Sequence, residues 1–256
     1  MTSGSGKARE SISAFFPAYN DAPSLPGLLE TAFRTLEEHF SDYEVIVIND
    51  GSTDDTAPLL AGLQQQYGSR LRVVTHGKNQ GYGAALRSGF AAATKDLVFY
   101  TDGDGQYDPA ELMSLYRALQ PETGLVNGFK LERNDPRHRI WIGTIYNWFA
   151  RLLFGVRLRD IDCDFRLIRR RVLDGLNLCS TSGTICVELV RKIEMSGCAV
   201  EEAGVHHYAR RHGRSQFFRF QSLLTTFYQL LRLRIQLFFL FVLVFRPAVE
   251  ECLSLP

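Results

Sequence analysis

The stretch LVFYTDGDGQYDP, residues 97–109, joins an apolar run to a loop that carries Asp102, Asp104 and Asp108. The run is typical of a buried strand, and like charges a few ångströms apart are unfavourable unless a cation lies between them. Asp102 and Asp104 can both turn toward one hard cation, and Gln106 adds a neutral oxygen. Such ligands suit Mg²⁺ or Mn²⁺, which commonly share phosphate oxygens with a substrate. We therefore predict that these three residues bind a metal and, through it, a diphosphate.

Two other interpretations of the acidic loop are limited by neighbouring residues. An EF-hand is excluded because Tyr107 occupies the glycine position and Met113 the position of the bidentate glutamate. A helix cap explains Asp108, since Asp108-Pro109-Ala110-Glu111 is a capping box with proline at the first helical position. We assign Asp108 to the cap and keep the first two aspartates for the metal.

The sequence up to about residue 129 alternates short β-rich runs with longer stretches of helical periodicity. The expected strands are Ile12–Phe16, Tyr43–Ile48, Leu71–Thr75, Asp96–Thr101 and Leu125–Phe129. The expected helices are Leu25–Phe40, Asp54–Tyr67, Tyr82–Thr94 and Pro109–Leu119. This alternation implies parallel strands with crossover helices. We predict an α/β fold with a Rossmann-like, mostly parallel sheet and helices on both faces.

Polar loops follow the first four expected strands, at residues 17–21, 49–55, 76–83 and 102–108, and the last three of them contain glycines. In open sheets of this type, ligands lie beyond the carboxyl ends of the strands. We therefore expect the four loops to converge on one site.

Two carboxylates in these loops are candidates for contacts with a nucleoside. Asp50 precedes the helix start marked by Ser52, Thr53 and Asp55, so capping does not explain it. Its carboxylate suits hydrogen bonds to a nucleobase or ribose, and Asp21 is a second candidate for the same pocket.

The glycine-rich loop at residues 78–83 matches neither the Walker nor the Rossmann phosphate-binding pattern. It either contacts a phosphate or ribose, or it is a plain turn.

Composition narrows the class of protein. The chain has 256 residues and a formal net charge of +1, so nothing in its charge points to nucleic acid. Its five cysteines include no C-x-x-C pair, which favours reduced thiols over a zinc or disulfide framework. Residues 1–10 are expected to be a disordered lead-in without the apolar core of a secretory signal.

The second half has looser patterning. A helix at Ile140–Phe154, a helix at Ile185–Met195 and a strand-like stretch at Ala199–His207 are expected to complete one domain over residues 11–215. Residues 216–248 are strongly apolar, but Arg232 and Arg234 divide them into runs shorter than the roughly 20 residues of a spanning helix. We expect membrane-interfacial helices there, with a membrane span, a buried helix or an oligomer face as alternatives, and a short tail at 249–256.

Six motifs carry a family resemblance. They are PAYND (17–21), VINDGSTD (47–54), NQGYGAA (79–85), TDGDGQ (101–106), Asp160 with Phe165-Arg166-Leu167, and RRHGRS (210–215). In order and spacing they resemble family 2 glycosyltransferases of the glycosyltransferase-A fold, and the last two resemble the dolichyl-phosphate mannosyltransferase branch. The resemblance covers about residues 10–215.

The resemblance implies roles for particular positions. The donor diphosphate and its Mg²⁺ or Mn²⁺ correspond to Asp102, Asp104 and Gln106. Positions that correspond to the donor site are Pro17, Tyr19, Asp21, Asp50, Lys78, Gly81, Asp102 and Gly103. The positions expected to hold the acceptor phosphate are Arg133, Arg166, Arg210 and Ser215. Asp104, Arg166 and Arg210 are the expected catalytic residues.

These roles imply inverting transfer of a hexose from a nucleotide sugar, GDP-mannose or UDP-glucose, to a membrane polyprenyl or dolichyl phosphate. A lipid phosphate is already an anion, so it needs positive charge to hold it rather than a base to deprotonate it. The expected location is the cytoplasmic side of the membrane, peripheral or monotopic, with a homo-oligomer as an open alternative.

The chain departs from the branch at two places. Asp21 stands where glutamate is usual, and Cys163-Asp164 stand where small residues are usual before Phe165. The Q-x-x-R-W motif of processive synthases is missing from the sequence.

Two rival functions stay open. One is a glycosyltransferase acting on a sugar or lipid hydroxyl, which needs a carboxylate base such as Asp162 or Asp164. The other is an inactive nucleotide-sugar-binding scaffold.

Overall fold

The computed structural model describes residues 7–132, 137–210 and 226–237. Its strands are β1 (Ile12–Ala18), β2 (Tyr43–Asn49), β3 (Leu71–Thr75), β4 (Leu97–Thr101), β5 (Thr123–Lys130), β6 (Phe165–Arg169) and β7 (Ala199–Val205). Its α-helices are α1 (Leu25–His39), α2 (Thr56–Tyr67), α3 (Tyr82–Ala92), α4 (Leu112–Ala118), α5 (Arg137–Phe154), α6 (Arg170–Leu173) and α7 (Ile185–Met195). Short 3₁₀ turns lie at η1 (Gly68–Arg70) and η2 (Pro109–Glu111).

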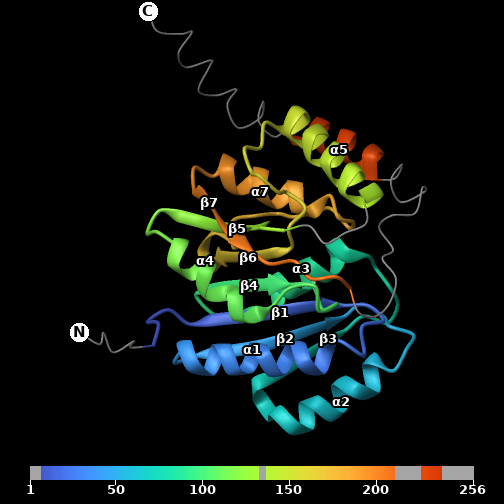
Figure 1. The fold of residues 1–256 in the computed structure, drawn as a ribbon, viewed down its shortest axis with the longest axis vertical. Coiled ribbons are helices and arrows are strands. Elements are labelled where there is room, and N and C mark those ends of the chain that lie inside the picture. Colours follow the sequence, from blue (N-terminus) through green and yellow to red (C-terminus); the bar gives the residue numbers. More distant parts are fainter. Residues whose placement is uncertain (1–6, 133–136, 211–225, 238–256) are drawn as a thin grey trace, which may run out of the picture.

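The seven strands form one sheet in the order β3-β2-β1-β4-β6-β5-β7 (Figure 1). Pairing is parallel throughout β3-β2-β1-β4 and again between β5 and β7. Only β6 runs antiparallel, against β4 on one side and β5 on the other. The predicted α/β fold with a mostly parallel sheet is therefore confirmed.

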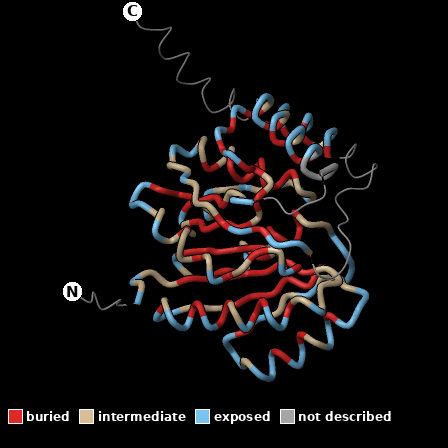
Figure 2. Tube along the Cα trace, in the orientation of Figure 1, coloured by how far each residue is buried: buried red, intermediate tan, exposed pale blue. Residues whose placement is uncertain are grey.

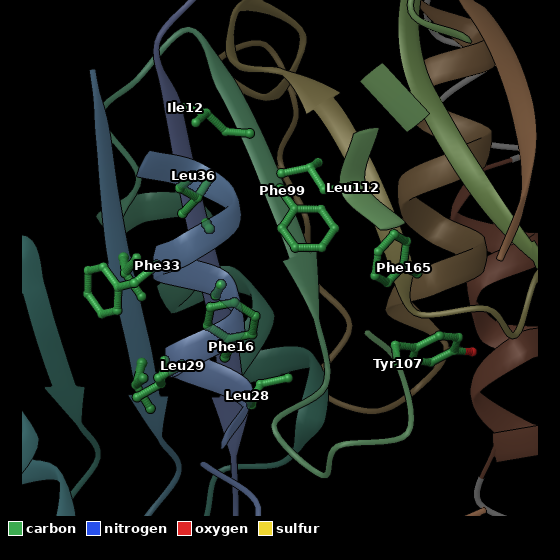
Figure 3. Packing of buried hydrophobic residues seen from close by; sticks show 14 of the residues in the cluster. Ile12, Phe16, Leu28, Leu29, Phe33, Leu36, Phe99, Tyr107, Leu112 and Phe165 are labelled. Atoms are coloured by element: carbon green, nitrogen blue, oxygen red, sulfur yellow. The ribbon is translucent and has the colours of Figure 1, made fainter. Parts of the chain in front are cut away.

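One face of the sheet is covered by α1, α2 and α4. Phe16 of β1 and Phe99 of β4 point into this layer and pack against Leu29 of α1 and Leu112 of α4 (Figure 3). All four are at most 1% exposed. Because side chains alternate along a strand, the neighbours of Phe16 and Phe99 belong to the opposite layer.

The opposite face is covered by α3, α5 and α7. Phe15 and Tyr100 stack there with ring centroids 5.2 Å apart, in a cluster that includes Leu86 of α3, Phe154 of α5 and Ile185 of α7. The central strands are buried on both sides, while the helices expose their outer surfaces (Figure 2). The rigid sheet between these layers fixes where its edge loops lie.

The expected helices and strands are found with shifts of up to three residues at their ends, apart from three differences and from the short η1 and α6, which the sequence analysis does not predict. The stretch Pro109–Leu119 is not one helix but η2 followed by α4, and Asp108 caps η2 by accepting the Ala110 amide at 2.9 Å. Glu111 does not complete the capping box, because it accepts the His206 amide instead, at 3.0 Å.

The second difference is β6, which the sequence does not predict. Its residues appear in the sequence as part of a polar motif, whereas the structure pairs Arg166 of β6 with Tyr100 of β4 and Asn127 of β5. The sheet is therefore continuous from β4 to β5.

The third difference concerns the two ends of the chain. Ala8 forms a bridge with Phe40 and donates its amide to the His39 carbonyl at 2.8 Å, so the expected disordered lead-in does not extend to residue 8. Residues 1–6 lie outside the described residues.

Part of the apolar tail packs on the domain. Residues 226–237 are helical, and Leu230, Leu233 and Leu237 are buried in the same cluster as α5 and α7. Phe227 contacts Phe149 of α5 with ring centroids 4.7 Å apart. Across the described part of the chain, no helix combines the length and apolar character needed to cross a membrane. The remainder of the tail prediction, 216–225 and 238–248, falls outside the described residues.

Candidate active site

The loops after β1, β2, β3 and β4 meet at the carboxyl edge of the sheet, as the sequence predicts. The Gly103 amide donates to the Pro17 carbonyl at 3.0 Å, and the Asp50 amide donates to the Ala18 carbonyl at 2.9 Å. The Gln80 amide in turn donates to the Asp50 carboxylate at 2.9 Å. Pro17 and Gly103 thus join the loops after β1 and β4 through a main-chain hydrogen bond, and these two loops lie side by side.

Asp102 lies at this edge near the carboxylates of Asp164 and Asp104. Its Oδ1 accepts a hydrogen bond from the Tyr82 hydroxyl at 2.8 Å. Burial, followed by the charges of Asp164 and Asp104, holds the pKa of Asp102 well above its usual range, although the Tyr82 hydrogen bond opposes the shift. A cation bound here would favour the ionised carboxylate, so the site chemistry fits a metal.

Asp104 is buried, with its side chain 5% exposed, and both of its carboxylate oxygens have partners. Oδ1 accepts the amide of Gln106 at 2.9 Å, and Oδ2 forms an ion pair with Arg210. Arg210 itself stays 23% exposed. A metal that binds Asp104 therefore has to compete with the Arg210 guanidinium.

The described residues contain no group of three His, Cys, Asp or Glu side chains that could enclose a metal. Mg²⁺ is normally bound by one or two carboxylates together with substrate phosphates and water. Asp102 and Asp104 match that pattern, so a metal held jointly with a diphosphate fits this edge.

Gln106 has a different set of partners from the one expected of a metal ligand. Its Nε2 donates to the Tyr208 carbonyl at 3.1 Å and lies 3.2 Å from His207 Nε2. Its Oε1 accepts from Arg210 Nε at 3.4 Å. Gln106 therefore joins the acidic loop to the segment after β7, and its metal contact stays a prediction.

Asp21 faces the same acidic region from the loop after β1. Its Oδ2 accepts the Tyr19 amide at 3.0 Å. Burial is the main cause that raises the pKa of Asp21 to about 6; the Tyr19 hydrogen bond opposes the shift and the charge of Asp104 adds to it. The structure thus brings Asp21, and Tyr19 with it, close to Asp102 and Asp104, and the contacts of Tyr19 and Asp21 with a donor stay predictions.

The loop after β2 is joined to the loop after β1 by Asn20, which the sequence analysis did not single out. Asn20 has φ 59°, a left-handed conformation that asparagine tolerates better than most residues. Its Oδ1 accepts the Thr53 amide at 2.7 Å, and its own amide donates to Ser52 Oγ at 3.0 Å. The predicted capping role of Ser52 is therefore wrong: its hydroxyl anchors Asn20, and α2 begins after Asp55 without a side-chain cap.

Asp50 is 3% exposed and directs its carboxylate into the protein. It accepts hydrogen bonds from His76 and from the amides of Gln80 and Gly81. The carboxylate thus holds the loop after β3, on which Lys78 is exposed. A direct contact between Asp50 and a nucleoside stays a prediction.

Arg166 does not reach the surface of the site, which corrects its predicted contact with a phosphate. It is 0% exposed, and its guanidinium donates to Asn127 Oδ1 at 2.6 Å, the Tyr100 hydroxyl at 2.7 Å and the Ile161 carbonyl at 2.6 Å. Each of its three nitrogens has a protein partner, so a phosphate has no access. Arg166 instead ties β6 to its neighbours and to the loop at residue 161.

Asp164, one candidate base for a hydroxyl acceptor, is also engaged. Its Oδ1 accepts the Cys186 thiol at 3.0 Å and lies 4.0 Å from Arg166 Nη1. Asp162 contributes its carbonyl, which accepts from Lys130 Nζ at 3.2 Å. Arg133 and Ser215, expected to hold the acceptor phosphate, lie outside the described residues.

Tyr82 and Lys130 are among the functional candidates that sequence reasoning missed. Tyr82 follows Gly81 at the start of α3, and only the folded chain brings its hydroxyl to Asp102. Lys130 ends β5 and places Nζ 3.7 Å from Asp160. An aromatic hydroxyl directly after the glycine that precedes an expected helix is the one local signal that could have pointed to Tyr82.

The sequence matches the model of the family described as "Glycosyl transferase family 2" over residues 13–176, which is more than half of the chain. The chain belongs to glycosyl transferase family 2. The matched region contains the D-x-D loop and every loop at the carboxyl edge from β1 to β4.

Curated relatives of this family 2 chain include two proteins named undecaprenyl-phosphate 4-deoxy-4-formamido-L-arabinose transferase. The relative from Aeromonas hydrophila subsp. hydrophila is 31% identical over 206 residues, covering 80% of this chain and 62% of the relative. One from Pseudomonas aeruginosa is 29% identical, covering 80% and 60%. The chain thus spans about three fifths of the length of these relatives.

The fold resembles glucosyl-3-phosphoglycerate synthase from Mycobacterium tuberculosis. Its complex with UDP matches with a TM-score of 0.68 at 20% identity, over 88% of this chain and 80% of that one. Its complex with Mn²⁺, UDP and phosphoglyceric acid matches with a TM-score of 0.67 at 20% identity, over 88% and 79%. The expected glycosyltransferase-A fold class is confirmed.

The raised pKa of Asp21 predicts a pH-dependent cost to stability. A carboxyl whose pKa rises from 3.8 to about 6 on folding destabilises the native state as pH rises through that range, fully above it and not below it. Asp21→Asn should therefore stabilise the protein at pH 7.5 by about 1–3 kcal/mol, and the gain should shrink between pH 6 and pH 4. Urea unfolding without metal or nucleotide measures this, with the exposed Asp55→Asn as control. A gain that does not change with pH contradicts the prediction.

The Arg210–Asp104 ion pair predicts an unusual effect on metal binding. Arg210→Gln removes the guanidinium that competes for Asp104, so Mn²⁺ alone should bind about three- to tenfold more tightly. Calorimetric titration with Mn²⁺ tests this, with Arg117→Gln on the exposed side of α4 as the matched loss of charge. Unchanged or weaker Mn²⁺ binding by Arg210→Gln would show that the pair does not oppose the metal.

Proposed function

We propose that this chain transfers a sugar, with inversion and with the help of Mg²⁺ or Mn²⁺, from a nucleotide sugar to the phosphate of a membrane polyprenyl phosphate. The observation that carries the proposal is the meeting of Asp102, Asp104 and Arg210 at the carboxyl edge of the sheet. Such an edge offers a place for a metal-bound diphosphate beside a cation suited to a second phosphate. The names of the curated relatives, which specify undecaprenyl phosphate, support the choice of acceptor.

The donor in this proposal lies with its diphosphate toward Asp102 and Asp104. A bound divalent metal supplies positive charge that stabilises the departing nucleotide. Tyr82 fixes the orientation of Asp102, and Asp21 and Tyr19 border the donor from the first loop. GDP-mannose and UDP-glucose are the hexose donors to compare, together with the 4-deoxy-4-formamido-L-arabinose donor suggested by the relatives' names.

The acceptor phosphate in this proposal is held by Arg210. Arginine's planar fork can bind phosphate oxygens bidentately. Because a phosphate monoester is already anionic at neutral pH, no carboxylate base is required. This agrees with the contact of Asp164, a candidate base, whose Oδ1 accepts the Cys186 thiol.

An exposed apolar surface supports attachment to a membrane. On α5, Trp141, Ile145, Trp148 and Leu152 recur at helical spacing and are 71%, 59%, 62% and 65% exposed. The helical residues 226–237 lie beside α5 (Figure 1) and expose Phe227, Tyr228, Leu231 and Ile235.

The charges on this surface indicate which partner it fits. Residues 137–154 and 226–237 contain no Asp or Glu, whereas Arg151, Arg232 and Arg234 are exposed. Tryptophan and arginine beside apolar residues suit the interface of an anionic bilayer. We therefore propose peripheral attachment through this surface, which extends the interfacial prediction for the tail to α5.

The proposed reaction is tested by incubating the protein with labelled nucleotide sugars, Mn²⁺ and polyprenyl phosphate and measuring label in the organic phase. Label should appear with one donor and disappear on chelation. Asp104→Asn should reduce the rate by at least about a hundredfold, because it removes one of two metal carboxylates. Asp108→Asn is the matched control, since Asp108 caps η2 and should leave most of the activity.

Two outcomes would replace the proposal. An empty organic phase with sugar transferred to a glycan or lipid hydroxyl supports the hydroxyl-acceptor enzyme. Nucleotide binding without any transfer or donor hydrolysis supports the inactive scaffold.

The proposed membrane surface predicts the effect of adding a charge to α5. Trp148→Glu should weaken co-sedimentation with phosphatidylglycerol vesicles by about tenfold or more, because it removes an apolar side chain and adds repulsion. Gln65→Glu, exposed on α2, adds the same charge on a different part of the molecule (Figure 1). Equal loss in both variants would show general charge repulsion instead of docking through α5.

A further inference from the structure

His76 and Asp50 form a buried pair that the proposed reaction does not yet use. His76 Nδ1 lies 2.6 Å from Asp50 Oδ1, and the two side chains are 8% and 5% exposed. His76 Nε2 lies 2.8 Å from Ser88 Oγ on α3. Because a carboxylate can only accept, Nδ1 carries the proton toward Asp50 and donates it.

The rest of the Asp50 carboxylate holds the main chain of the loop after β3. Oδ1 also accepts the Gln80 amide at 2.9 Å, and Oδ2 accepts the Gly81 amide at 3.0 Å. Three donors therefore converge on one carboxylate, and two of them belong to consecutive residues of the loop. Hydrogen bonds to a charged group are stronger than those between neutral groups, so this arrangement fixes the loop firmly.

Two glycines allow the loop after β3 to pack closely against neighbouring backbone. Gly51 has φ 66°, and a Cβ there would lie 2.3 Å from the Lys78 carbonyl carbon. Gly81 has φ 94°, and a Cβ there would lie 2.5 Å from the Thr181 carbonyl oxygen. The loop thus runs between two backbone segments, and the Asp50 carboxylate sets its position between them.

One residue links the position of this loop to Asp102, one of the two aspartates predicted to bind the metal. Gly81 immediately precedes Tyr82, whose hydroxyl donates to Asp102 Oδ1 at 2.8 Å. A shift of the Gly81 amide therefore moves the start of α3 and the hydroxyl that orients Asp102. The connected path is His76, Asp50, Gly81, Tyr82 and Asp102.

We propose that His76 is a positioning residue of the donor site: its Nδ1 proton holds Asp50, which sets the loop at 78–82 and, through Tyr82, the orientation of Asp102. This inference deepens the proposed function and rests on it for the identity of the ligand, a metal-bound nucleoside diphosphate. Asp50 then serves the donor through the loop.

The same three side chains have the order and distances of a Ser-His-Asp triad, with Ser88 in the place of the nucleophile. The loop amides on Asp50 and the continuation to Asp102 favour positioning over nucleophilic catalysis. A fluorophosphonate probe separates the two, because covalent labelling of Ser88 would establish a nucleophile and overturn the proposal.

Two amide substitutions of His76 each keep a different one of its two side-chain contacts. In His76→Asn, the side-chain amide takes the place of Nδ1 and can still donate to Asp50. In His76→Gln, the longer side chain puts its amide at the place of Nε2, near Ser88 and away from Asp50. Both variants lose the ring, so a purely structural role of the imidazole affects them equally.

The full chain is titrated calorimetrically with UDP and with GDP, each with Mn²⁺. His76→Gln should lower affinity for the nucleotide that wild type binds by about tenfold, whereas His76→Asn and Ser88→Ala should stay within about threefold. Hydrogen exchange of the peptide spanning 77–82 should accelerate in His76→Gln and not in His76→Asn. This second readout requires no ligand.

Each outcome bears on one of the two proposals. Equal behaviour of the Asn and Gln variants in both readouts overturns the positioning role. If wild type binds neither nucleotide while the exchange still separates the variants, the positioning of the loop holds and the proposed function fails.

Discussion

The constraint on which the rest of this molecule depends is the concentration of negative charge where parallel strands end. Asp21, Asp102 and Asp104 come from loops far apart in the sequence, and the order of β1 and β4 in the sheet places them together. Burial and neighbouring carboxylates both oppose ionisation of Asp21 and Asp102 and raise the pKa of each. A site built in this way favours cations, and Arg210 is the protein's own cation at this position. Its side chain is 23% exposed, and the proposed function gives it the acceptor phosphate as a second partner.

The first half of the fold could be predicted because its signals are local. Apolar runs and helical periodicity identify β1 to β5 and α1 to α4, and the parallel arrangement follows from their alternation. The β6 strand escaped prediction because its second residue is Arg166, which in sequence is typical of a surface or a phosphate site. Its burial requires Asn127 and Tyr100, which lie 39 and 66 positions away in the chain. No local pattern contains that information.

The contrast between local signals and distant contacts also decides which parts of the site could be predicted. The acidic loop and the cap at Asp108 were predictable from adjacent residues. The side chains whose partners are distant were not: Ser52 anchors Asn20, Gln106 reaches Tyr208, and Tyr82 reaches Asp102. In each case the sequence shows a polar residue at a strand end, and only the sheet order determines which loop it contacts. Sequence motifs thus identified the loops that meet at this edge of the sheet but left the assignment of individual side chains open.

The residues after β7 contribute to both places that the proposed function uses, the acidic loop and the apolar surface of α5. The Tyr208 amide donates to the Gln106 carbonyl at 2.8 Å, so the chain is fixed to the acidic loop just before Arg210. Farther along, the helical residues 226–237 pack beside α5, where exposed tryptophans suit a bilayer interface. The chain after β7 therefore contributes to two places, the acidic loop near Arg210 and the apolar surface beside α5. The proposed transfer from a water-soluble donor to a lipid phosphate requires both places on one molecule, because the sugar and the lipid headgroup must meet while the lipid tail stays in the membrane.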